Sequence, residues 1–328
     1  MHRKRQKTTL PNGLAAHGAT PNTVRLYQLI LDYFNYGVRF APGMTVVDVG
    51  ANIGLFSMEV LQRCGGDVDL IAVEPGPLAH GHLERNLLEH FPASPVRTMR
   101  CALSDHSGEA VFYDRPLASA LSSLEPGGLT DRRRLVASLL KSDPPAPFQS
   151  MTPRWLRRLP RPIATRALDW LIRRAESKVV PAQCELKTLS QIIAEESIAR
   201  VDFLKVDVEG AELKVLGGVA PADWPKIQAL AVEVHDVDDR VESLRRMLED
   251  AGFSRIEVGQ EWLFESSNVY MIFAERNRPD GSTSVDFHSR TSPVEADPLD
   301  RRRRPHPIGP ELRAALASDR RVEEDPDR

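Results

Sequence analysis

The chain has 328 residues, of which 41% are hydrophobic, and this is enough to bury the core of one large domain or two small ones. A net charge of −3 gives no global attraction to nucleic acid, so we expect no nucleic-acid partner. The three cysteines are dispersed without C-x-x-C spacing, and the basic start has no apolar run behind it; we expect a cytoplasmic protein with neither structural zinc nor a transmembrane segment.

A first helix is predicted after Thr20, an N-cap residue followed by Pro21 at the first helical position. Its apolar side chains share one face: Leu26, Leu29, Ile30, Tyr33 and Phe34. We expect this stripe to be core rather than a cofactor site. Residues 1–40 are therefore interpreted as an N-terminal arm with a helix that caps the pocket or the sheet edge.

The next segment, residues 46–54, is an apolar strand that enters a turn with glycine at 50 and 54, before a helix near 54–63. Without Cβ atoms at these positions, the turn can approach a small ligand closely. A dinucleotide fingerprint would need glycine where this chain has Asn52 and Leu55. The Asn52 amide instead suits an amino-acid carboxylate and ammonium, which S-adenosylmethionine carries. The alternative is an ordinary turn that binds nothing.

The second predicted strand, residues 68–73, ends at Glu74, and a helix is predicted at 77–90. Glu74 follows Gly54 by 20 residues. A carboxylate at this place can accept hydrogen bonds from both hydroxyls of a ribose. A surface glutamate at a strand end is the alternative.

A third strand is predicted over residues 96–103 and leads to Ser104 and Asp105, before a short strand at 110–113. Doubly wound folds bind ligands at the carboxyl ends of their strands, so Asp105 could accept an adenine amino hydrogen. Ser-Asp-x-x-Gly is also good turn chemistry, which makes a simple hairpin an equal alternative.

Residues 115–182 interrupt the alternation of strands and helices with nine prolines and a local charge of +8. One apolar stripe within the segment predicts an amphipathic helix: Ile163, Ala167, Leu168, Leu171 and Ile172. We expect an insertion of one or two helices that covers the pocket with its apolar face and leaves its arginines solvated. The alternative is a basic, tryptophan-bearing face that meets an acidic carrier protein or an anionic membrane surface.

Regular structure is predicted to resume with a strand at 183–187, followed by a helix that begins at the capping box formed by Thr188 and Gln191. A strand over 201–209 comes next, and Gly210 begins a short helix. Because side chains alternate along a strand, three charged residues fall on one side of it: Lys205, Asp207 and Glu209.

The strand predicted at 227–235 places Glu233 and His235 on one face by the same parity. Two further strands are predicted at 253–258 and 269–274. No long helix lies between these two strands, so we expect an antiparallel pair at the sheet edge.

Beyond Glu275 the chain has seven prolines and few large apolar residues. This composition predicts that 277–328 is a disordered, charged tail.

The elements together predict an α/β fold: a doubly wound, Rossmann-like sheet of seven strands over residues 41–276, with an antiparallel edge pair and a helical insertion. Four segments resemble the FkbM family of class I S-adenosylmethionine-dependent methyltransferases, which typically methylate oxygen: VVDVGANIGLFS (46–57), IAVEPGP (71–77), CALSD (101–105) and FLKVDVEGAELKVLGG (203–218). The resemblance implies S-adenosylmethionine as cofactor and a small-molecule, lipid, glycan or carrier-bound acceptor.

Carried over position by position, the resemblance also implies site residues. The expected cofactor-binding residues are Asp48, Gly50, Asn52 and Gly54 at the methionine end, Glu74 at the ribose, and Ser104 with Asp105 beside the adenine. Asp207 and Glu209 would stand beside the methionine end and the acceptor.

Methyl transfer from a sulfonium requires the protein to align the acceptor and, for a hydroxyl, to remove its proton. Asp207, Glu209, Glu233 and His235 are candidate bases, and Asp207, Glu209 and His235 are our expected catalytic residues. A carboxylic acid acceptor would need no base. Lys205 is expected to pair with a carboxylate rather than act as a nucleophile. We expect no metal, with magnesium or manganese on Asp207, Glu209 and His235 as the alternative.

Two functions from other classes are also compatible with the sequence. An NAD-dependent oxidoreductase would use a similar sheet and Glu74, although the glycine pattern argues against it. A non-catalytic binding module would act through the basic insertion.

Overall fold

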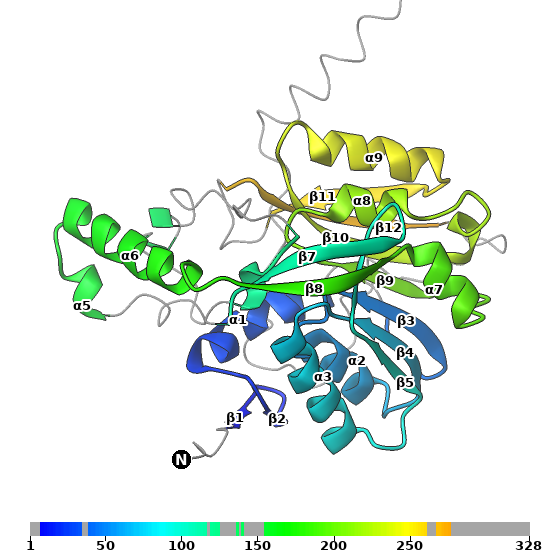
Figure 1. Cartoon of the computed structure of the whole chain (residues 1–328), viewed down its shortest axis with the longest axis horizontal. Helices are drawn as coiled ribbons and strands as arrows, with labels where there is room; N and C mark the ends of the chain where they lie inside the picture. Colours follow the sequence, from blue (N-terminus) through cyan, green and yellow to red (C-terminus); the bar gives the residue numbers. More distant parts are fainter. Residues whose placement is uncertain are drawn as a thin grey trace, which may run out of the picture.

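The computed structural model describes residues 7–34, 39–116, 119–124, 136–137, 139–140, 154–260 and 267–276 (Figure 1). A seven-stranded sheet lies at its centre, with the order β11-β12-β10-β9-β3-β4-β5. The strands of this sheet are β3 (Met44–Val49), β4 (Val68–Val73), β5 (Val96–Met99), β9 (Phe203–Val206), β10 (Ala229–His235), β11 (Arg255–Gly259) and β12 (Val269–Glu275).

Strand direction divides the central sheet into two parts. The neighbours β10, β9, β3, β4 and β5 run parallel to one another. β12 lies between β10 and β11 and runs antiparallel to both, so β11 forms the edge of the sheet. The predicted doubly wound sheet and its antiparallel edge pair are therefore confirmed.

Helices cover both faces of the sheet because alternate strand residues enter two separate apolar clusters. On one side Val46 packs with α1 (Pro21–Asp32), α2 (Leu55–Arg63) and α3 (Pro77–His90). On the other side Val47 belongs to a cluster with three further helices: α7 (Leu189–Glu195), α8 (Glu212–Gly217) and α9 (Arg240–Asp250). Central parallel strands are buried on both faces in this arrangement, as their continuous apolar sequences require.

The helix α1 begins as predicted, with Thr20 in a capping box and proline in the first turn. Its aromatic stripe is core: Tyr33 is 2% exposed and packs edge-on against Phe56 of α2 and Phe273 of β12. A short hairpin of β1 (Thr8–Thr9) and β2 (Ala15–Ala16) precedes it.

The predicted third strand over residues 96–103 is wrong in one respect, because the chain leaves the central sheet after Met99. Residues 101–103 form β6 (Cys101–Leu103), which pairs with β8 (Val180–Lys187) in a separate three-stranded sheet completed by β7 (Gly108–Asp114). The pairing joins segments on both sides of the insertion, and a local sequence pattern carries no information about such a long-range contact.

The described part of the insertion contains η1 (Ser119–Leu121), α5 (Arg154–Arg157) and α6 (Arg161–Glu176). Figure 1 shows α5 and α6 extending away from the two sheets. Their apolar faces form a small cluster of their own around Leu156, Ala164 and Leu168. The expected cover, with its apolar face packed over the pocket, is therefore not what these helices form.

Two expectations concern the chain as a whole. Within the described ranges, no helix has the length and apolar character needed to cross a membrane. The predicted tail, 277–328, lies outside the described residues.

Candidate active site

The turn after β3 is held against the neighbouring strands by its backbone. Gly50 and Gly54 have φ values of 79° and 88°, and Asn52 has a φ of 50°. The Gly50 and Ala51 amides donate to the carbonyl oxygen of Val73, at the end of β4, both at 3.0 Å. The predicted turn is confirmed, and the structure shows that it uses left-handed backbone at these three residues.

The two glycines also allow close packing within the protein around the turn. A Cβ on Gly50 would lie 1.7 Å from the carbonyl oxygen of Asp207, and one on Gly54 would lie 2.7 Å from Leu83 of α3. Glycine therefore lets the end of β9 and the helix α3 come close to the turn.

A buried ion network joins the ends of β3 and β9. Lys205 Nζ lies 3.1 Å from Asp48 Oδ1 and 3.4 Å from Asp207 Oδ2, and it donates to the carbonyl oxygen of Gly50 at 3.1 Å. Ser57 donates to Asp48 Oδ2 at 2.6 Å. Burial opposes the charge on Lys205, but the two aspartates outweigh it and raise its pKa above the ordinary value. The predicted pairing of Lys205 is confirmed.

The carboxylate of Glu74 lies under the same turn. It is 6% exposed and accepts the Asn52 amide at 2.8 Å and the Gly76 amide at 2.7 Å, one on each oxygen. Burial raises the pKa of Glu74 to about 7, although both hydrogen bonds favour the charged form. Each oxygen keeps a second lone pair, so this carboxylate can still accept two hydroxyl groups.

Asn52 itself offers an unsatisfied acceptor. Its side-chain Oδ1 is buried and has no hydrogen-bond partner among the described residues. Buried polar atoms are nearly always satisfied, so an orphaned one in a polar turn indicates a place for a donor from a ligand.

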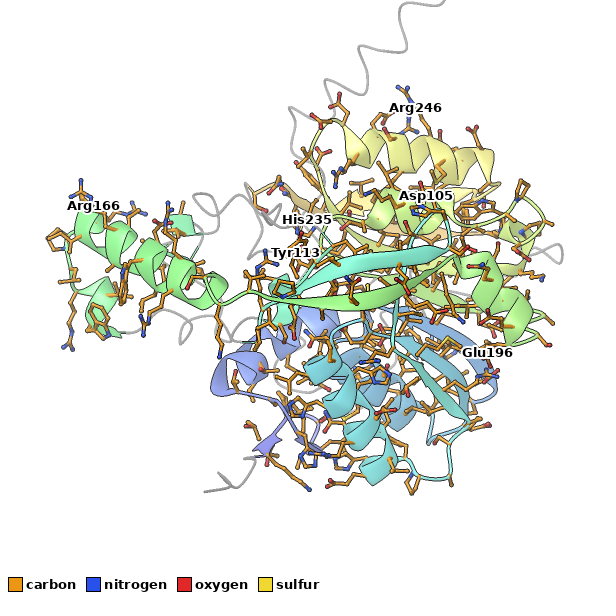
Figure 2. The ribbon with its side chains drawn as sticks, in the orientation of Figure 1. Asp105, Tyr113, Arg166, Glu196, His235 and Arg246 are labelled. Atoms are coloured by element: carbon orange, nitrogen blue, oxygen red, sulfur yellow. The ribbon has the colours of Figure 1, made fainter. Side chains whose placement is uncertain are left out.

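A second polar group, which we call the acidic cluster, is formed by Glu209, Glu212, Glu233 and His235. His235 Nε2 lies 3.2 Å from Glu209 Oε2, and His235 Nδ1 lies 3.2 Å from Glu212 Oε1. His235 ends β10 and is 1% exposed. Figure 2 shows it at one end of that strand. Asp207 connects this cluster to the ion network of Lys205.

The cluster perturbs the ionisation of its members. Burial disfavours the charged imidazole, but attraction and hydrogen bonding by Glu209, Glu212 and Glu233 outweigh it and raise the pKa of His235 to about 11. Burial and like charges raise the pKa values of Glu209 and Glu233. His235 is therefore protonated at neutral pH in this environment, unlike an ordinary histidine.

Glu209 reaches the cluster by a route that side-chain alternation did not predict. β9 ends at Val206, and Glu209 has a left-handed φ of 52°, so the chain is no longer extended there. The parity of Glu233 and His235 on β10 does hold, since both face Glu209.

Ser104 and Asp105 lie elsewhere. They follow β6, where the Ser104 amide donates to Lys187 at the end of β8, and a Cβ on Gly218 would lie 2.2 Å from the Ser104 carbonyl oxygen. The Asp105 side chain is 51% exposed and contacts His106. Figure 2 shows Asp105 apart from His235. Ser104 and Asp105 thus follow a strand of the three-stranded sheet rather than a strand of the central sheet, and their role at the adenine stays a prediction.

Two contributors to the site were missed. The sequence pattern places Glu212 only in a short helix, yet its side chain is fully buried against His235. Asp114, at the end of β7, lies close enough to Glu74 to raise its pKa further. Glu212 could have been found from its spacing, since it follows Glu209 by three residues at the start of a helix. No local sequence pattern indicated Asp114.

The comparisons with known proteins agree with this geometry. Residues 48–255 match the family model described as the methyltransferase FkbM domain. A 31-O-demethyl-FK506 methyltransferase from Streptomyces tacrolimicus is 31% identical over 271 residues, which cover 81% of this chain and 95% of the relative. The AMB antimetabolite synthetase AmbE from Pseudomonas aeruginosa is 30% identical over 277 residues, covering 81% of this chain and 12% of that protein.

Among solved structures, the magnesium protoporphyrin IX methyltransferase ChlM from Synechocystis with bound S-adenosylmethionine matches 76% of each chain, at 10% identity and a TM-score of 0.35. The family match runs from the end of β3 to the start of β11, and it includes both the turn above Glu74 and the acidic cluster. The chain belongs to the FkbM family of methyltransferases, with S-adenosylmethionine as methyl donor.

Proposed function

We propose that the protein transfers a methyl group from S-adenosylmethionine to a hydroxyl oxygen. The acidic cluster is the observation that carries this proposal. A hydroxyl can donate a hydrogen bond to the carboxyl groups of Asp207, Glu209 and Glu233, whereas a carboxylate acceptor has no proton to donate to them. The name of the Streptomyces relative, a 31-O-demethyl-FK506 methyltransferase, also supports methylation of oxygen.

The cofactor would occupy the turn after β3. The orphaned Asn52 Oδ1 suits the ammonium group of the methionine end, and Glu74 has the free lone pairs for a ribose. Asp48 and the two glycines shape this wall from behind, through Lys205 and through close backbone packing. The bound sulfonium would supply an activated methyl group, so that the protein needs mainly to orient the acceptor.

Ser104 and Asp105 stay a prediction for the adenine subsite. Their place beside the end of β8 makes a direct role less well supported than that of Glu74. Replacing Asp105 with Ala and measuring S-adenosylmethionine affinity tests it, and unchanged affinity would remove Asp105 from the cofactor site.

The acceptor would face Asp207, Glu209 and His235, which we assign as the catalytic residues. Asp207 and Glu209 follow β9, His235 is the last residue of β10, and the backbone of Asp207 contacts the cofactor turn at Gly50. Asp207→Ala and His235→Ala should abolish turnover while S-adenosylmethionine still binds. Full turnover in both variants would refute the assignment.

The reaction type can be tested without knowing the acceptor. Cell extract is incubated with the protein and methyl-labelled S-adenosylmethionine, and the labelled product is then treated with mild alkali. An ether keeps its label, whereas a methyl ester releases labelled methanol. We expect retained label and an O-methyl carbon resonance; released methanol or an N-methyl resonance would contradict the proposal. Small-molecule, lipid, glycan and carrier-bound acceptors are distinguished by the isolated product.

A further inference from the structure

We propose that Glu209, Glu233 and His235 form a binding site for one divalent cation. One potential ligand atom from each residue lies within 4.8 Å of the other two. Two carboxylates and an imidazole at this separation can converge on a single ion, because each metal–ligand bond is roughly 2.0–2.3 Å long.

The imidazole is already oriented as metal-binding histidines are. Nδ1 of His235 contacts Glu212 Oε1, while Nε2 faces Glu209. Glu212 is anchored in turn, since its Oε1 accepts the Gly210 amide at 2.6 Å. Arg240 donates to the Gly210 carbonyl at 2.8 Å and fixes the loop from outside. A carboxylate that holds the second ring nitrogen orients the ring, and a cation bound at Nε2 would replace the proton on that nitrogen.

Charge balance points to a cation as well. Among the described residues, the fully buried Glu212 has one carboxylate oxygen without a hydrogen bond. Lys205 is committed to Asp48 and Asp207, and Arg240 lies 3.9 Å from Glu212. His235 contacts Glu209, and carboxyl groups that face one another in a buried site are costly to ionise without a further cation.

The donor set selects the kind of ion. Carboxylate oxygens favour magnesium and manganese, and a single imidazole is compatible with manganese. The group contains no cysteine. Manganese is therefore the appropriate probe.

The role of the cation site rests on the proposed function, in which the acceptor binds beside this cluster. An acceptor hydroxyl that coordinates a divalent cation loses its proton more easily. The O–H bond would break with the proton passing to the Asp207 carboxylate, the oxygen would bond to the methyl carbon, and the carbon–sulfur electron pair would stay on sulfur.

The test is a titration of the full-length, chelator-treated protein with Mn²⁺, followed by the electron paramagnetic resonance signal of the free ion. We expect one saturable site in the wild type and at least a tenfold weaker one in Glu233→Gln and His235→Gln. Glu109→Gln, an exposed glutamate on β7, serves as the matched control and should bind normally. Thermal melts identify any variant that has not folded.

The absence of a saturable site in the wild type, or equal affinity in wild type and Glu233→Gln, would overturn the inference. So would displacement of Mn²⁺ by S-adenosylmethionine, since the cluster would then serve as counter-charge for the sulfonium. S-adenosylmethionine binding is measured on the same samples by calorimetry. A wild type that binds Mn²⁺ but no S-adenosylmethionine would refute the proposed function while leaving the cation site intact.

Discussion

Gly50 shows how one residue fixes the geometry of the candidate site. Its missing Cβ lets the Asp207 carbonyl approach the cofactor turn, and its φ of 79° is strained for any other residue. The turn and the acidic cluster are thus held together by backbone contact as well as by Lys205. Single-residue changes at this point should separate packing from chemistry.

Gly50→Ala is predicted to destabilise the protein by about 3 kcal/mol or more, because a Cβ 1.7 Å from a backbone oxygen forces the chain apart. Gly43→Ala is the matched control, since Gly43 also has a positive φ but nothing within 4 Å of its added Cβ. It should cost only about 1–2 kcal/mol of backbone strain. Chemical denaturation measures both; equal losses would contradict the packing role of Gly50.

From the raised pKa of Glu74 we predict that cofactor binding depends on pH. Its folded pKa is raised to about 7, and only the ionised carboxylate accepts two hydroxyl donors. Affinity for S-adenosylmethionine should therefore fall about tenfold between pH 8 and pH 6. Calorimetry across this range checks it, and a flat profile would show that Glu74 is ionised throughout or unused.

The contribution of Glu74 to the free energy of unfolding changes with pH in the opposite direction to that of a glutamate whose pKa is lowered by folding. The folded state keeps the Glu74 proton to a higher pH than the unfolded state, whose pKa is near 4.5. In the ligand-free protein, the contribution of Glu74 to stability is present below pH 4.5 and decreases as the pH rises towards 7.

At the scale of elements, the α5–α6 arm is distinct from the sheets. Leu168 is 6% exposed within the small cluster of the arm, whereas Trp155 and Trp170 are 55% and 59% exposed. Arg174 lies over the Trp170 ring at 5.8 Å, and Figure 2 shows Arg166 on the same extended helix. Exposed tryptophan among arginines is typical of a surface that meets an acidic partner.

We predict that the protein binds anionic lipid vesicles in low salt and that Trp170→Ala weakens this binding without changing stability by more than about 0.5 kcal/mol. Leu168→Ala, in contrast, should disrupt the arm itself. Vesicle co-sedimentation at several salt concentrations measures the effect. Binding that is equal in wild type and Trp170→Ala would contradict the role of this face.

At the scale of the whole molecule, the sequence predicted the central sheet because its signals are local. Apolar strands, the N-cap at Thr20, the capping box at Thr188 and the glycine turn each occupy a few neighbouring residues. The separate sheet of β6, β7 and β8 was missed because its pairing spans the insertion.

The candidate site was likewise predictable where its signals are local in the sequence and not where they depend on packing. Asn52 and Glu74 were predicted from one turn and one strand end, and they do meet through a hydrogen bond. The burial of Glu212 against His235, by contrast, depends on how α8 and β10 pack, which no spacing rule specifies.

We infer that the turn above Glu74 binds the cofactor and that the acidic cluster binds the acceptor. Calorimetric titration of S-adenosylmethionine into wild type, Glu74→Ala and His235→Ala tests it most directly. Loss of two charge-assisted hydrogen bonds should weaken binding about 10- to 100-fold in Glu74→Ala, while His235→Ala should stay within about threefold of wild type. Wild-type affinity in Glu74→Ala, or an equal loss in both variants, would contradict this division of the site.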